Sequence, residues 1–289
     1  MDAYSPSARL IQKWNFFMYS IMKTGPVILH NVIYNEGNYL SVTALQSASC
    51  SDEFLSSYAV LQLLPELTQI TDDDINTVFF IDNETPHYRN ILQTPEYEPT
   101  VKVTSDPFAD MDRFTLDGET LQNMDNERSM ACYHVNMASF LKLGQWFEYL
   151  KKAGVYDNSR IIIVSDHGYN LANFESMLVS EDNDAEWLNA LLMVKDFGET
   201  GPLRTRYDFM TTGDVPVITM DGLIDDPVNP FTGNPITSDV DKEEQMATTA
   251  HEAWTVVSYR DKTTYDLSDG SFWKVHGDVR DKTKWERVE

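Results

Sequence analysis

The residues best suited to chemistry are Asp166 and His167, in the motif Ser165-Asp166-His167-Gly168 directly after the apolar run Ile161–Val164. In open α/β sheets, ligands bind beyond the carboxyl ends of the strands, which is where these side chains emerge. An aspartate oxygen and a histidine nitrogen together suit Mn²⁺ or Zn²⁺. Neighbouring residues in a strand point to opposite faces, so Asp166 and His167 can reach one ion only where the chain leaves the strand. Gly168 permits a bend of the backbone at that point. The motif predicts a metal site; the alternative is that Asp166 caps the next segment and His167 is an ordinary polar loop residue.

A second polar segment, NETPHYR at residues 83–89, follows another apolar run at residues 78–81. It can reach the same edge of the sheet as the first motif. His87 as a donor and the Arg89 guanidinium fork, placed near a metal, suit a phosphate or sulfate oxygen. The alternative is a proline-containing turn whose polar residues face water. His134 lies near the start of a predicted helix, where a polar residue is more often a hydrogen-bonding group than a ligand.

Apolar patterning predicts the elements that position these residues. Residues 78–81 and Ile161–Val164 are apolar without alternation, as in strands covered on both faces. Residues 127–153 place their apolar positions on one helical face, and Gly154 stands where a C-terminal cap belongs. Residues 190–194 and 215–219 indicate two further strands. The predicted fold class is α/β, with a mostly parallel or mixed sheet and helices on both faces.

The chain divides by pattern into three stretches. Residues 1–75 form a helical N-terminal segment, because apolar residues there recur at three and four. Residues 76–240 form the α/β core. Residues 241–289 form terminal strands of the same domain, since the tail alternates aromatic, β-branched and charged residues from about residue 255 to 285. A loop with three prolines spans residues 225–235.

Charge and composition exclude several classes of function. The 289 residues contain 22 Lys+Arg and 46 Asp+Glu, a net charge of −24, so the chain lacks the basic face that a nucleic-acid binder needs. An anionic substrate would require a local positive charge, such as a metal. The two cysteines are too few for a disulfide framework. No apolar run reaches membrane-spanning length and no signal peptide is visible, so the chain as given is expected to be soluble.

Several segments together resemble the sulfatase-like hydrolase/transferase family of the alkaline phosphatase superfamily. The branch they are most similar to is the membrane-anchored one that includes lipoteichoic acid synthase and phosphoethanolamine transferases. The resemblance spans residues 76–239, and the loop at residues 83–87 and the segment 210–216 fall in the order that the family shows. The remaining similar segments are YHVN at 133–136, the helix with WFEYLK at 146–151, GVYDN at 154–158 and IIIVSDHG at 161–168.

The resemblance implies a mechanism and a set of roles. A hydroxyl nucleophile attacks phosphorus or sulfur while bound metal neutralises the developing charge, and the covalent ester passes to water or another alcohol. Asp166 and His167 would be ligands of a divalent metal, Mn²⁺ or Zn²⁺ before Ca²⁺ or Mg²⁺. His87 would donate to an oxygen of the anionic ester substrate, a lipid or glycan headgroup or a sulfate ester, and Arg89 and His134 would line its site.

The chain departs from the family upstream of residue 78. The family nucleophile and a further acidic metal ligand lie on a first strand and the helix after it, and neither is found here. Thr43 and Cys50 lie in a segment without the Pro and Arg expected around a sulfatase nucleophile. The chain is therefore expected to be the downstream part of such an enzyme, or a binding or structural relative that lost catalysis. For the full-length protein the resemblance implies the extracytoplasmic face of the bacterial cytoplasmic membrane, with membrane association through sequence outside this chain.

Overall fold

The computed structural model describes residues 6–35, 39–40, 50–72, 75–116, 119–180, 183–237, 245–249 and 271–288. The chain forms two compact units. Unit 1 comprises Met1–Asp117 and Met124–Ala153, and unit 2 comprises Gly118–Asn123 and Gly154–Glu289. This division differs from the boundaries expected at residues 75 and 240. The helix at Glu127–Lys152, which was expected in the core, belongs to unit 1 because it packs against the helix at Asp52–Leu67 of the N-terminal segment.

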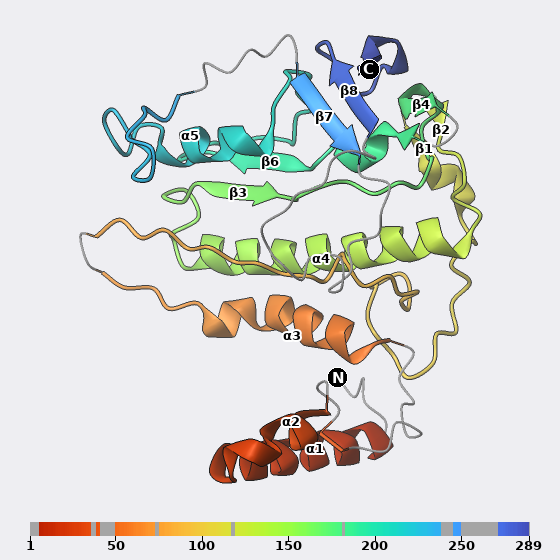
Figure 1. The fold of residues 1–289 in the computed structure, drawn as a ribbon, viewed down its shortest axis with the longest axis vertical. Helices are drawn as coiled ribbons and strands as arrows, with labels where there is room; N and C mark the ends of the chain where they lie inside the picture. The colour runs from red at the N-terminus through yellow and green to blue at the C-terminus, as the bar shows by residue number, and fades with distance from the viewer. Residues whose placement is uncertain are drawn as a thin grey trace. The chain divides into compact units, whose positions relative to one another are not determined.

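Unit 1 begins with a helical hairpin. Helix α1 (Pro6–Thr24) is followed by Gly25, and the short helix α2 (His30–Tyr34) packs beside it (Figure 1). A 3-10 turn at Val27–Leu29 leads into α2, which ends at Asn35 in the left-handed conformation, φ 44°. Met18 and Ile33 are the buried apolar residues of the hairpin among its described side chains. The helical periodicity of this stretch is confirmed.

Helices α3 (Asp52–Leu67) and α4 (Glu127–Lys152) pack side by side in unit 1 (Figure 1). Each begins with a side-chain cap, because Ser51 and Asn126 each accept a hydrogen bond from a backbone N–H three residues on. Helix α4 confirms the helix expected at residues 127–153, and Gly154 follows it with φ 76°, the left-handed conformation of a helix C-terminus. The core of the unit is formed by Cys50, Phe54, Leu55, Tyr58, Leu92, Tyr97, Val135 and Ala138.

The apolar run at residues 78–81 is not the buried strand that its composition predicts. Its backbone is irregular, and the side chains of Val78, Phe79 and Phe80 are 76%, 75% and 90% exposed. An apolar run becomes a buried strand only where neighbouring strands and helices cover it. No strand of the described chain pairs with this run.

Unit 2 contains the strand that carries the candidate metal motif. Strand β3 (Ile161–Val164) pairs with β6 (Leu192–Lys195), in the register Ile161 opposite Lys195 and Val164 opposite Leu192 (Figure 1). Both strands were expected from the sequence. Their pairing is antiparallel, whereas a mostly parallel sheet was expected, and β3 is half-buried to exposed. The structure thus has mixed α/β character with small sheets.

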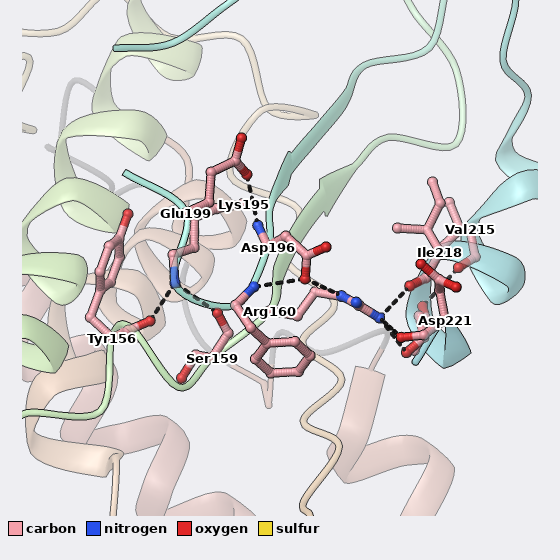
Figure 2. Close-up of polar contacts among 11 residues, drawn as sticks. Tyr156, Ser159, Arg160, Lys195, Asp196, Glu199, Val215, Ile218 and Asp221 are labelled. Carbon is pink, nitrogen blue, oxygen red and sulfur yellow. Dashed lines mark hydrogen bonds and ion pairs between the residues drawn. The ribbon is translucent and has the colours of Figure 1, made fainter. Parts of the chain in front are cut away.

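Arg160 fixes the start of β3 to its surroundings. Its side chain is 9% exposed, and its Nε donates to Asp196 Oδ1 at 2.9 Å (Figure 2). Its Nη1 donates to the carbonyl oxygens of Ile218 and Asp221, each at 2.7 Å. These carbonyls lie at the C-terminus of a short helix, where a cation is favoured. Hydrogen bonding from Arg160 also lowers the pKa of Asp196.

That short helix is α5 (Val215–Met220), where a strand was expected at residues 215–219. The β-branched run favours a strand, but the residues before it form a helix start. Thr211 and Asp214 form a reciprocal capping box, in which Asp214 Oδ2 accepts from the Thr211 backbone N–H at 2.8 Å. Pro216 stands in the first helical turn, where its missing N–H costs nothing. The loop expected at residues 225–235 follows, closed by an antiparallel bridge between Val228 and Pro235.

The C-terminal part of unit 2 contains a three-stranded antiparallel sheet in the order β7, β8, β9. These strands are Gln245–Thr249, Ser271–Val275 and Trp285–Val288. The expected tail strands are confirmed for β8 and β9; residues 250–270 lie outside the described chain. Apolar side chains of this sheet join the second core, which contains Met177, Ala185, Trp273, Val275 and Trp285.

The remaining elements are short. The strands are β1 (Thr115–Leu116), β2 (Glu119–Thr120), β4 (Leu178–Ser180) and β5 (Asn183–Asp184), and the 3-10 turns are Met111–Phe114, Glu175–Met177, Ala185–Leu188, Thr212–Asp214 and Lys282–Lys284. Over the described ranges, none of the helices is both long enough and apolar enough to cross a bilayer.

Candidate metal centre

Asp166 and His167 lie where the chain leaves β3. Ser165 continues the strand, since its N–H donates to Leu191 O at 3.0 Å and its Oγ accepts from Leu191 N–H at 2.8 Å. Beyond it, Asp166 Oδ2 lies 3.6 Å from His167 Nε2, with the aspartate side chain 87% exposed and the histidine 38% exposed. The two potential ligand atoms therefore lie near each other, and both side chains are accessible to solvent. Asp166 Oδ1 accepts the His167 backbone N–H at 2.9 Å, which fixes the carboxylate.

The tautomer of His167 follows from its other ring nitrogen. Nδ1 lies 2.6 Å from the carbonyl oxygen of Gly168, and because a carbonyl only accepts, Nδ1 carries the proton. In the neutral ring, Nε2 is then the nitrogen with the lone pair, and it lies on the side of Asp166. An Nδ1–H bonded to a backbone carbonyl is the usual arrangement behind a metal-binding histidine. Two tetrahedral ligands bound at about 2.1 Å stand about 3.4 Å apart, close to the observed 3.6 Å.

The His167 ring is held by Trp187. The two rings stack with centroids 4.2 Å apart and planes 17° apart. The Gly168 N–H donates to the Trp187 carbonyl at 2.9 Å, so backbone and side chain of Trp187 both hold the motif. Gly168 is required for a different reason than the bend expected from sequence. A Cβ at this position would collide with the carbonyl oxygen of Glu186, so the glycine allows two backbone segments to touch.

Glu186 anchors the loop that follows the motif. Its buried carboxylate accepts the Phe174 backbone N–H at 2.6 Å and also the backbone N–H groups of Leu171 and Asn173. Burial raises the pKa of Glu186 to about 7, against the effect of these hydrogen bonds. Asp184 Oδ2 accepts the Ala172 N–H at 2.8 Å, so two carboxylates hold consecutive parts of the same loop.

Asp166 and His167 are two potential ligands for a metal ion. In the part of the chain that the structure describes, no group of three or more His, Cys, Asp and Glu residues is placed to hold a metal. The pair fits a divalent cation by donor type, tautomer and separation, and such an ion would complete its coordination with water or substrate oxygens. The upstream candidate Thr43 lies outside the described residues.

His87 and Arg89 share an exposed loop of unit 1, as expected from the sequence. The loop is anchored by Asn83, whose Nδ2 donates to Ser57 O of α3 at 2.9 Å. Asn83 Oδ1 accepts both the backbone N–H and the hydroxyl of Thr85, which closes the turn. His87 and Arg89 thus share one loop of unit 1, and Asp166 and His167 lie 3.6 Å apart after β3 in unit 2.

His134 does not line an exposed site, which corrects the role expected for it. Its side chain is 0% exposed, and its Nδ1 accepts the Leu92 backbone N–H at 3.0 Å. Burial lowers the pKa of His134 to about 4, so the ring is neutral at pH 7. Tyr97 packs edge-on against the ring with centroids 5.1 Å apart. His134 therefore joins α4 to the segment around Leu92.

Sequence reasoning missed Glu186 and Trp187. Both lie some twenty residues after the motif, in a 3-10 turn with no repeating pattern. A tryptophan next to an acidic residue was the available signal, but the ring that it stacks on can be named only from the structure. Comparison of the sequence with protein-family models finds no matching family, and comparisons with curated proteins and with solved structures find no significant match.

Proposed function

We propose that the chain forms part of a metal-dependent hydrolase or transferase of phosphate or sulfate esters, with Asp166 and His167 as ligands of the metal. The observation that carries the proposal is the geometry after β3: the Nδ1–H of His167 is bound to Gly168 O, and Nε2 faces Asp166 Oδ2 at 3.6 Å. The resemblance of the surrounding segments to sulfatase-like enzymes supplies the reaction class, and with it an alkaline phosphatase-like α/β core as the proposed fold.

Charge supports a cation at this position. The chain has a net charge of −24, which repels an anionic ester from most of its surface. A bound divalent ion, Mn²⁺ or Zn²⁺ by ligand type, would supply the Lewis acidity that draws charge from an ester oxygen. Trp187 and Gly168 hold His167 in its binding orientation. By the same resemblance, His87 and Arg89 are proposed donors to an oxygen of an anionic ester.

The same resemblance proposes a setting for the reaction. Relatives of the membrane-anchored branch work on lipid or glycan headgroups at the extracytoplasmic face of the bacterial cytoplasmic membrane. The nucleophile is assigned to no residue of this chain. Turnover by the chain alone is therefore a stricter test than metal binding, and the two are measured separately.

Calorimetric titration of the metal-stripped chain with Mn²⁺ and Zn²⁺ tests the metal assignment. We expect one site whose affinity falls at least about 100-fold in both Asp166→Ala and His167→Ala. His276→Ala is the matched control, because His276 Nε2 lies 3.8 Å from Glu286 Oε2 in the same unit, a similar histidine–carboxylate pair. Unchanged affinity in either motif variant, or an equal loss in the control, would refute the assignment of the metal ligands.

Hydrolysis of a chromogenic phosphodiester and of a chromogenic sulfate ester, each with the bound metal, tests the reaction class. Saturable turnover that disappears in Asp166→Ala supports the enzyme and identifies the ester. Metal binding without turnover of either ester by the chain would contradict catalysis by this chain and favour a binding module that kept the metal site.

A further inference from the structure

The N-terminal hairpin has an apolar face that the described chain leaves exposed. Four residues of α1 at spacings of four, three and four lie on one side of the helix, and we call them the apolar stripe: Leu10, Trp14, Phe17 and Ile21. Their exposed fractions are 63%, 44%, 56% and 37%. At the turn into α2, Val27 and Ile28 are 79% and 85% exposed. An apolar surface of this extent marks a site of interaction with protein or membrane.

The charge of the hairpin differs in sign from that of the whole chain. Residues 6–35 contain three basic residues and none of the chain's 46 acidic ones. Lys13 and Lys23 are exposed, and Lys23 Nζ lies 5.4 Å from the centre of the Tyr19 ring. In a chain of net charge −24, this stretch therefore combines exposed apolar side chains with a net positive charge. That combination complements a surface that is both apolar and anionic.

We propose that the α1–α2 hairpin binds the surface of an anionic lipid bilayer, with the apolar stripe entering the interface between headgroups and acyl chains. Helices with Trp, Phe and Leu on one face and Lys or Arg beside it lie in this plane. Trp14 suits the position, because its ring is apolar and its Nε1–H is already satisfied by Tyr39 O at 3.1 Å. Lipid is favoured over a protein partner by the absence of acidic residues, since protein surfaces present both signs of charge. The inference does not depend on the metal site.

Co-sedimentation of the full chain with unilamellar vesicles tests the proposal. We expect binding to vesicles that contain phosphatidylglycerol, and at least tenfold weaker binding to vesicles of phosphatidylcholine alone. Leu10→Gln and Phe17→Gln should each lower partitioning about tenfold, because each removes an apolar side chain from the interface. Lys13→Gln and Lys23→Gln should each lower it about fivefold on the anionic vesicles only. Leu203→Gln, at a 79% exposed leucine of unit 2, is the matched control and should change nothing.

A second measurement places the stripe in the bilayer. Brominated acyl chains should quench tryptophan emission of the wild-type chain, and Trp14→Phe should bind equally well and lose that quenching. Circular dichroism confirms that each variant keeps its helix content. Absence of binding to anionic vesicles, or binding that the stripe variants leave unchanged, overturns the proposal. A dimer seen by light scattering without lipid and dissolved by Phe17→Gln also overturns it, because the stripe would then face a second copy of the chain.

Discussion

Glu186→Gln should remove a pH dependence from the stability of the protein. The buried carboxyl has a pKa of about 7 in the folded chain, against 4.5 as its ordinary value. Because the folded state holds the proton more tightly, this group stabilises the fold fully below its unfolded pKa and loses its contribution as pH rises through the folded pKa. Glutamine has the same shape and does not titrate.

The size of the effect follows from the two pKa values. One pKa unit corresponds to about 1.4 kcal/mol, so the step from 4.5 to about 7 corresponds to about 3 kcal/mol in full. About 2.5 kcal/mol of this falls between about pH 5 and about pH 8. The free energy of unfolding of the wild type, minus that of Glu186→Gln, should decrease by this amount over that range.

Urea unfolding followed by circular dichroism at a series of pH values measures this difference, and every group common to both proteins cancels in it. Glu175→Gln removes an exposed carboxylate of the same unit and is the matched control. A wild-type-minus-variant difference that stays constant within about 1 kcal/mol across the range would refute the reasoning. So would an equal pH dependence in the control.

Three further changes test other contacts. Arg160→Met should lower the free energy of unfolding by about 3 kcal/mol, because the two carbonyls at the end of α5 lose their charged donor. Urea unfolding measures this change, and a decrease of less than about 1 kcal/mol would contradict the prediction. The free energy of unfolding of the wild type, minus that of His134→Asn, should decrease by about 3 kcal/mol between pH 7 and pH 4. The reason is that the His134 ring has a pKa lowered to about 4 in the folded chain and so takes up a proton mainly on unfolding. A difference that stays constant over this range would contradict the prediction. Trp187→Ala should weaken metal binding about tenfold while Trp187→Phe keeps it; calorimetry decides, and equal affinities would show that the stack is irrelevant.

Elements set by local chemistry could be predicted from the sequence. The periodicity of residues 127–153 and the glycine after them are enough to define α4, because amphipathic helices and their caps depend on near neighbours. Strand β3 follows from a β-branched run and strand β6 from an apolar run, each bounded by polar residues. The Asp166–His167 pair could be found because the two residues are adjacent in the chain and follow such a strand.

Features set by distant partners could not be predicted in this way. Residues 78–81 have the composition of a buried strand, but coverage depends on other segments, and the described chain leaves Val78, Phe79 and Phe80 exposed. Residues 215–219 have the composition of a strand, but Asp214 before them and Arg160 from another segment hold a helix. Histidine is a residue type common in functional sites, and only the hydrogen bond between the His134 ring and the Leu92 backbone shows that this one is structural.

The contact between Gly168 and the carbonyl of Glu186 has a consequence for protein engineering. The Asp166–His167 motif and the turn at residues 184–189 are shaped against each other, so the tetrapeptide alone is not a transferable module. A graft onto another scaffold must carry both segments, with a strand pair like β3 and β6 to hold them in register. In a mutational library, any side chain at position 168 should be recovered only together with changes in that turn. The two segments should therefore change together, although some twenty residues separate them in the chain.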